Sequence, residues 1–139
     1  MRKVLWSGMA AIGLACTSCG NSNNLYPVSG TVNYKGSPAA GATVFLHRKG
    51  GNAMNDHTIM GIVQEDGSFT LVCGSLGEGA PPGEYDVLIE WKHDLKQPKG
   101  LNRKGHDRLK GRYADPAHPR LHAVVKAETN HLAPFEVTD

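Results

Sequence analysis

Apolar side chains recur at every second position in short runs after residue 26, and this alternation constrains the fold more than any other feature of the chain. Val28 and Val32 lie in phase in the first run, and Val44 and Leu46 lie in phase in the second. Because successive side chains of a β-strand point to opposite faces, each run predicts a strand with one buried face. Helical spacing of apolar residues is missing from this part of the sequence, so we expect an all-β domain.

Five further runs complete the predicted set of strands. The seven strands are expected within residues 26–36, 41–49, 58–64, 68–73, 84–92, 121–126 and 132–137. The 17 glycines and eight prolines supply the turns, and a chain of 139 residues has room for one core. The sequence therefore predicts one seven-stranded Greek-key β-sandwich. The residues expected in its core are Val28, Val32, Val44, Leu46, Ile62, Phe69, Leu71, Tyr85, Val87, Ile89, Leu121, Val125 and Phe135.

The segment QEDGSFTL, residues 64–71, joins two of these strands and contains an acidic pair. A calcium loop needs oxygen ligands at every second position and a distant Glu, and only Asp66 is in register here. Asp66-Gly67 is instead typical of a tight hairpin, because glycine tolerates a positive φ. Cys73 lies in phase with the core residues that follow the turn, and we expect a small buried hydrophobe rather than a reactive thiol.

The first 19 residues have the composition of an export signal. Arg2 and Lys3 precede an apolar run, from Val4 to about Cys16, that is too short to anchor the chain permanently across a bilayer. Small residues precede Cys19, as the peptidase that processes bacterial lipoproteins requires. We expect residues 1–19 to be a lipoprotein signal segment that ends at the lipidation site Cys19, with Cys16 as the alternative. An ordinary cleaved signal stays open as a further interpretation.

This interpretation divides the chain into three parts. Residues 1–19 are the signal segment, residues 20–25 are a polar tether, and residues 26–139 are the β-sandwich domain. We expect the protein in the cell envelope, anchored to a membrane by its N-terminal lipid, on the periplasmic or outer-membrane side. Export separates it from nucleic acid, so no nucleic-acid partner is expected.

The sandwich is expected to carry a basic loop at residues 92–112. The loop has eight Lys or Arg and two Asp, whereas the rest of the mature chain has five basic and eleven acidic residues, so net charges of +6 and −6 are segregated. Clustered cations attract anionic lipids and acidic glycans at low salt. The candidate polyanion contacts are Lys99, Arg103, Lys104 and Arg108. A loop that is simply solvated is the alternative interpretation.

The seven histidines do not predict a metal site. His118 and His122 have the spacing of a helical ligand pair, but Pro116 and Pro119 prevent a helix there. The other histidines are scattered through predicted turns and strand surfaces. The sequence also lacks a serine-hydrolase elbow, a phosphate loop and a dinucleotide fingerprint. We therefore expect neither a metal nor another cofactor, and no enzymatic activity.

Four segments, in this order along the chain, resemble those of a known family: VSGTVNYKGSPAAGATVFL, EDGSFTL, GEGAPPGEYDVLIEW and GRYADPAHPRLHAVVKAETNHLAPFEV. Their order and spacing resemble the short exported lipoproteins of planctomycete-type bacteria that carry a carboxypeptidase-regulatory-like domain. The resemblance covers about residues 26–137 and implies a transthyretin-like β-sandwich that serves as an accessory, adhesive or stabilising module. The related hydroxyisourate hydrolases end in a Tyr-Arg-Gly-Ser motif, whereas this chain ends in FEVTD.

The resemblance also implies structural roles for two tyrosines. Tyr85 is expected to supply a core ring whose hydroxyl ties down a loop. The segment Tyr113-Ala114-Asp115-Pro116 is expected to anchor the basic loop where it returns to the sandwich.

Together these observations predict a lipid-anchored cell-envelope protein whose non-catalytic sandwich is a structural or interaction module. The expected partners are the membrane, through the N-terminal lipid, and an envelope protein or glycan. The alternative is an envelope protein that binds a polyanion or a metal ion through the basic loop or surface histidines.

Overall fold

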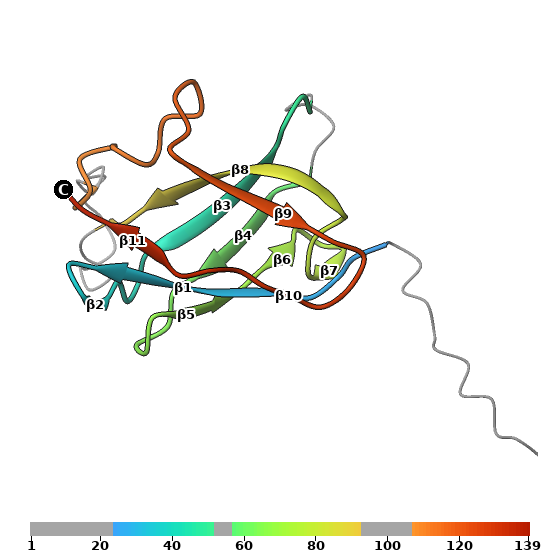
Figure 1. The fold of residues 1–139 in the computed structure, drawn as a ribbon, viewed down its shortest axis with the longest axis horizontal. Helices are drawn as coiled ribbons and strands as arrows, with labels where there is room; N and C mark the ends of the chain where they lie inside the picture. The colour runs from blue at the N-terminus through green and yellow to red at the C-terminus, as the bar shows by residue number, and fades with distance from the viewer. Residues whose placement is uncertain (1–23, 52–56, 93–106) are drawn as a thin grey trace, which may run out of the picture.

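A computed structural model of the chain describes residues 24–51, 57–92 and 107–139. These residues form two β-sheets that lie face to face, and none of them lies in a helix (Figure 1). The described part accordingly contains no helix that could span a membrane. The strands are β1 (Val28–Tyr34), β2 (Ser37–Pro38), β3 (Thr43–Arg48), β4 (Ile59–Ile62), β5 (Ser68–Thr70), β6 (Val72–Cys73), β7 (Gly77–Glu78), β8 (Gly83–Glu90), β9 (Leu121–Val125), β10 (Asn130–His131) and β11 (Phe135–Val137).

The strand β1 is the centre of the first sheet. It pairs with β10 and β11 in parallel and with β2 and β5 in antiparallel orientation. The second sheet has the order β7-β6-β4-β3-β8-β9, and all of its pairs are antiparallel. The prediction of an all-β sandwich is therefore confirmed.

The described residues form eleven strands in place of the seven predicted, because β2, β7 and β10 are short strands outside the predicted runs and one run divides between the sheets. Within residues 68–73, β5 pairs with β1 in the first sheet and β6 pairs with β4 in the second. Leu71 lies at the crossing and is buried. A Cβ on Gly61 of β4 would collide with the Thr70 carbonyl oxygen, so glycine allows the close approach there.

The core lies between the sheets and contains nearly all of the side chains predicted for it. Leu121 is half-buried, and the prediction for Ile62 is wrong, since 54% of its surface is exposed. Ile59 and Gly61 are the residues of β4 that face inward, so Ile62 points outward and Val63 after the strand is buried instead. Cys73 is buried as predicted, and burial raises the pKa of its thiol.

The predicted tight turn at Asp66-Gly67 is confirmed, but it connects the two sheets and is not a hairpin, because β5 pairs with β1 whereas β4 pairs with β3 and β6. The Gly67 N–H donates to the Gln64 carbonyl oxygen at 3.0 Å, and φ of Gly67 is 86°. The Asp66 carboxylate accepts hydrogen bonds from the hydroxyl and the main-chain N–H of Ser68 at 2.6 and 2.9 Å, which lower the pKa of Asp66. The Asp66 side chain therefore stabilises the turn through hydrogen bonds to Ser68, two residues further along the chain.

Replacing Gly67 with valine should destabilise the fold more than the same change at Gly36. Both glycines have a positive φ, 86° and 80°, which strains a β-branched residue. A Cβ at Gly67 would also lie 3.2 Å from Pro38 Cβ and from the Val32 carbonyl oxygen, whereas nothing lies within 4 Å at Gly36. We expect losses of about 3 kcal/mol for Gly67→Val and about 1–2 kcal/mol for Gly36→Val in urea unfolding. Equal losses would contradict the crowding at Gly67.

Candidate functional site

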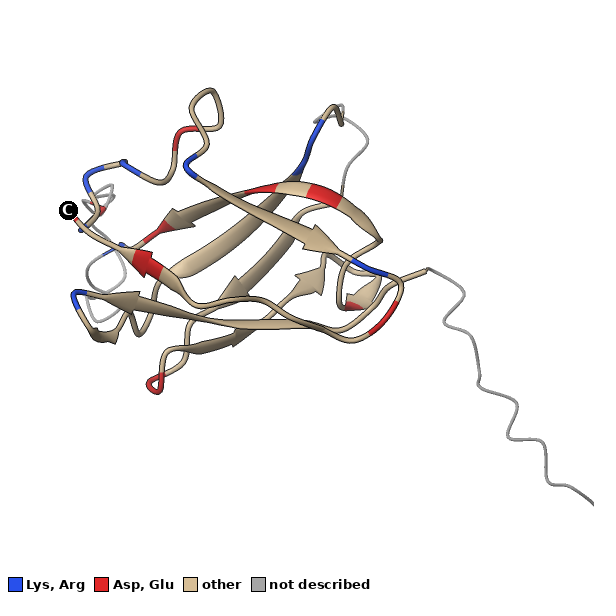
Figure 2. Ribbon diagram, viewed as in Figure 1, with Lys and Arg blue, Asp and Glu red and all other residues tan. Residues whose placement is uncertain are grey.

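Basic side chains gather at the end of the sandwich where β1 and β8 finish. We call this the basic end and define it by Lys35, Lys92, Arg108, Lys110 and Arg112. Figure 2 shows these Lys and Arg segments around the carboxyl end of the chain, interspersed with acidic ones. Lys35 follows β1, and the other four residues flank the part of the predicted basic loop that lies outside the described residues.

Trp91, directly after β8, holds the basic end to the core. Trp91 is 7% exposed, and its indole N–H donates to the Ala40 carbonyl oxygen at 2.9 Å. The Tyr34 ring meets it edge to face, with the ring centroids 5.3 Å apart. The Arg108 guanidinium lies 3.8 Å from the centroid of the Trp91 ring, close enough for a cation–π contact. This contact with a buried ring restrains the Arg108 side chain, so its positive charge is held beside Trp91.

Asp107 fixes the turn that carries the other cations. Its Oδ1 accepts hydrogen bonds from the N–H groups of Trp91 and Leu109 at 2.9 and 3.1 Å, and its Oδ2 accepts one from the Gly111 N–H at 2.9 Å. The Leu109 side chain is fully buried. Residues 107–112 are thus fastened to β8 by a carboxylate and to the core by an apolar side chain.

Tyr113 completes this attachment as the sequence predicted. Its main-chain oxygen accepts a hydrogen bond from the Ile89 N–H at 3.0 Å, and its hydroxyl oxygen accepts one from the Thr138 N–H at 3.2 Å. The second predicted tyrosine contact is also confirmed, because the Tyr85 hydroxyl donates to the Pro81 carbonyl oxygen at 2.7 Å. Tyr113 links the returning loop, β8 and the segment after β11.

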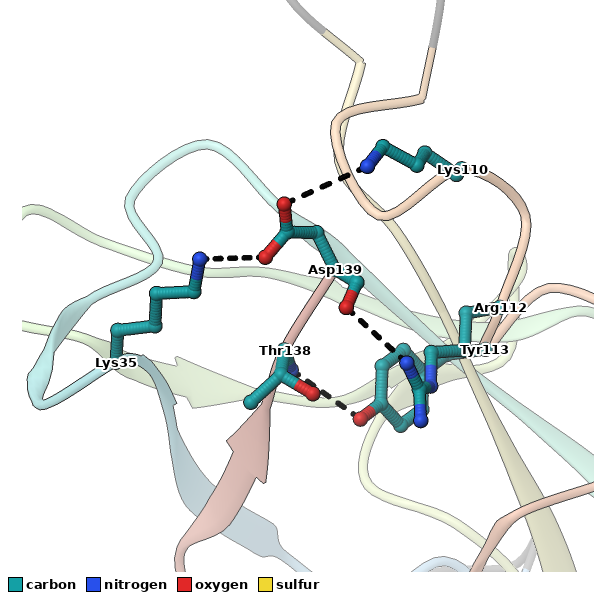
Figure 3. Close-up of polar contacts among 6 residues, drawn as sticks. All are labelled: Lys35, Lys110, Arg112, Tyr113, Thr138 and Asp139. Atoms are coloured by element: carbon teal, nitrogen blue, oxygen red, sulfur yellow. Dashed lines mark hydrogen bonds and ion pairs between the residues drawn. The ribbon is translucent and has the colours of Figure 1, made fainter.

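The Asp139 carboxylate lies among the cations that this framework positions (Figure 3). Its two oxygens lie 2.5 Å from Lys35 Nζ and 3.5 Å from Lys110 Nζ. The Arg112 guanidinium donates to the main-chain oxygen of Asp139 at 3.1 Å. Three cations from two separate turns therefore surround one acidic residue.

The charges of this cluster stabilise one another. Hydrogen bonding from the Lys35 ammonium, and then from the Tyr34 hydroxyl, holds the pKa of the Asp139 carboxyl far below its ordinary value of 3.8. The same contact with Asp139 raises the pKa of Lys35. Both residues are therefore charged throughout the neutral range.

The predicted site residues are only partly within the described structure. Cys16 and Cys19 lie outside the described residues, as do Lys99, Arg103 and Lys104. Arg108 is described and belongs to the basic end. Sequence reasoning missed Lys35, because a single lysine in a turn carries no sign of the distant segment that it meets.

Three of the five described histidines form pairwise side-chain contacts. His122 bonds Asp86 at 2.9 Å across β8 and β9, His118 bonds Asp115 at 2.8 Å, and His131 bonds the Ser29 hydroxyl at 2.8 Å. Within the described ranges, no group of three or more His, Cys, Asp or Glu is placed to hold a metal ion.

Two surface hollows lie apart from the basic end. One of about 380 Å³ is lined by residues that include Arg48, Cys73 and Tyr85. The other, of about 420 Å³, lies over β1 and β5 and is lined by residues that include Ser29 and His131. The charged cluster at the basic end is thus distinct from both hollows.

Neither a family model nor a curated protein matches the chain. Among solved structures, a DUF3823 family protein from Bacteroides ovatus matches with 14% sequence identity and a TM-score of 0.43. A DUF3823 family protein from Parabacteroides merdae matches with 17% identity and a TM-score of 0.37. Each match covers 81% of this chain and 44% of the other, so the chain spans less than half of either structure.

The ion pairs of Asp139 should make a small, pH-dependent contribution to stability. Because the folded-state pKa lies below 3.8, the contribution is complete above that pH and fades as the pH falls from 3.8 toward the folded-state pKa. We expect Asp139→Asn to lower the melting temperature by about 1–3 °C at pH 6 and low salt, since surface ion pairs contribute little. The difference from the unmodified chain should shrink below pH 3.8.

The matched control is Glu128→Gln, which removes an exposed carboxylate from the turn between β9 and β10. Its melting temperature should follow that of the unmodified chain at both pH values. A difference for Asp139→Asn that persists unchanged at acid pH would contradict an ionic origin.

Proposed function

We propose that the chain is a lipid-anchored cell-envelope protein whose sandwich is a non-catalytic interaction module. The observation that carries this proposal is the polarity of the domain. The described chain starts at one end of the sandwich, and the basic end lies at the other (Figure 1). An anchor before residue 24 would therefore hold the sandwich with its cationic surface directed away from the attachment point.

The attachment end is firmly joined to the sandwich. Leu25 is buried, and the main chains of Tyr26 and Ala80 exchange two hydrogen bonds of 3.0 Å. The eight residues of β8 run from this end to the basic end, a length of about 25 Å at the usual rise per residue. A short tether joined to a rigid body of this length suits a module that presents one surface at a distance from its anchor.

We propose further that the sandwich is of the transthyretin-like, carboxypeptidase-regulatory-like kind with a seven-stranded Greek-key core. The support is the resemblance of the four sequence segments, together with two facing sheets whose longer strands fall where the alternation predicts them. By analogy at the level of the fold, this assignment implies an accessory module.

A second candidate function is binding of a polyanion through the basic loop. It is favoured by one observation: Lys92 and Arg108, two described residues of the loop, lie at the basic end beside further cations. Neutralising Lys99, Arg103, Lys104 and Arg108 together should weaken salt-sensitive binding to anionic vesicles or glycans. Retention of binding by this variant would exclude these four side chains as the contact.

The lipid anchor is tested by labelling cells that express the full chain with palmitate. We expect the label to enter the protein, to be lost in Cys19→Ala and to be kept in Cys16→Ala, because a thiol must accept the acyl chain. Loss in Cys16→Ala alone would move the anchor to Cys16. A chain that stays unlabelled with both cysteines present would remove the anchor from this proposal.

A further inference from the structure

Asp139 occupies a position that a carboxylate from another molecule could take. Its side chain is held by Lys35 from the turn after β1 and by Lys110 from the returning end of the basic loop, while Arg112 contacts its main-chain oxygen. Ammonium and guanidinium groups that converge on one point form the usual protein receptor for an oxyanion. The carboxylate already bound there shows which chemical group the spacing of these cations fits.

The position of the cations is set by contacts that do not involve Asp139. Asp107 accepts the Gly111 N–H between Lys110 and Arg112, and Tyr113 bonds Ile89 of β8 directly after Arg112. Lys35 lies in the tight turn between β1 and β2. An anion that replaced Asp139 would thus meet cations whose main-chain segments are already fixed, which lowers the entropic cost of binding.

The exchange is accessible from solvent and costs little. The side chains of Lys35, Lys110 and Asp139 are 56%, 74% and 32% exposed. Ion pairs at this degree of exposure contribute little free energy because water and salt screen them. A ligand that carries several carboxylates and also contacts Arg108 would outcompete a single internal carboxylate.

We propose that Lys35, Lys110 and Arg112 form a binding site for the carboxylate groups of an acidic polysaccharide, and that Asp139 occupies it as an internal competitor. The second candidate function, polyanion binding, thereby gains a site made of described residues and one class of ligand, an acidic polysaccharide. A glycan is favoured over the anchoring bilayer because the basic end lies opposite the start of the described chain (Figure 1). Only this choice of partner depends on the proposed lipid anchor.

The test measures binding of polygalacturonate to the full-length chain in neutral detergent at low salt, with dextran as the uncharged polymer. Asp139→Asn should lower the dissociation constant about three- to tenfold, because it removes the competing charge and keeps the shape. Lys35→Gln with Lys110→Gln should raise it about tenfold, and the same pair changed to Arg should restore binding. Added salt should weaken all of these interactions.

The matched control is Lys49→Gln with Lys126→Gln, which removes the same charge from the segments after β3 and β9 and should change the dissociation constant less than about twofold. Equal weakening by the two lysine pairs would overturn the proposal in favour of unspecific charge attraction. Unchanged or weaker binding by Asp139→Asn would also overturn it.

Two further arms separate this site from the other proposals. If only the variant neutralised at Lys99, Arg103, Lys104 and Arg108 loses binding, these four side chains are the contact and this site is wrong. Binding to phosphatidylglycerol vesicles but not to polygalacturonate would overturn the proposal in favour of a lipid surface. Loss of palmitate labelling with the expected binding pattern would remove the anchor and leave the site in place.

Discussion

The parallel pairing of β1 with β11 is the interaction on which the rest of the structure depends. It brings the first strand of the described chain beside the last one, with Tyr34 in register with Val137. Val32 and Val137 are fully buried, so one residue of slip would turn these apolar side chains to solvent. The register also brings Lys35 and Asp139, which follow the two strands, close enough to form an ion pair. The charged cluster is therefore a consequence of how the first sheet is assembled.

A second set of contacts gives the domain its polarity. Trp91, Asp107 and Tyr113 fasten the ends of the basic segment to β8, while Leu25 and Tyr26 fasten the start of the described chain at the other end. Long-range charge alone would leave the cations free to sample many positions on the surface. The buried aromatic and the capping carboxylate restrict them to one end, which is the physical basis for proposing an interaction surface there.

Much of the fold could be predicted because alternation reports directly on which side chains face the core. The prediction from alternation was wrong at two places. Ile62 continues an apolar run but follows Gly61, which faces inward, so Ile62 faces solvent. Residues 68–73 alternate as one strand, although β5 and β6 within them belong to different sheets. Four strands of two residues, β2, β6, β7 and β10, are too short to show any period. In the candidate site, the sequence predicted Arg108 as a contact and Tyr113 as an anchor of the loop. It did not predict a role for Lys35 or Asp139.

The sequence by itself determined the β class of the domain, the faces of its longer strands, the tight turn at Asp66-Gly67 and the concentration of cations in one segment. These properties follow from neighbouring residues, since side-chain alternation, turn conformation and local charge density need no distant partner. Only the tertiary structure decided that Lys35, Lys110 and Arg112 converge on Asp139. That convergence depends on strand register and on the packing of Trp91 and Leu109, which arise from contacts between segments far apart in the chain.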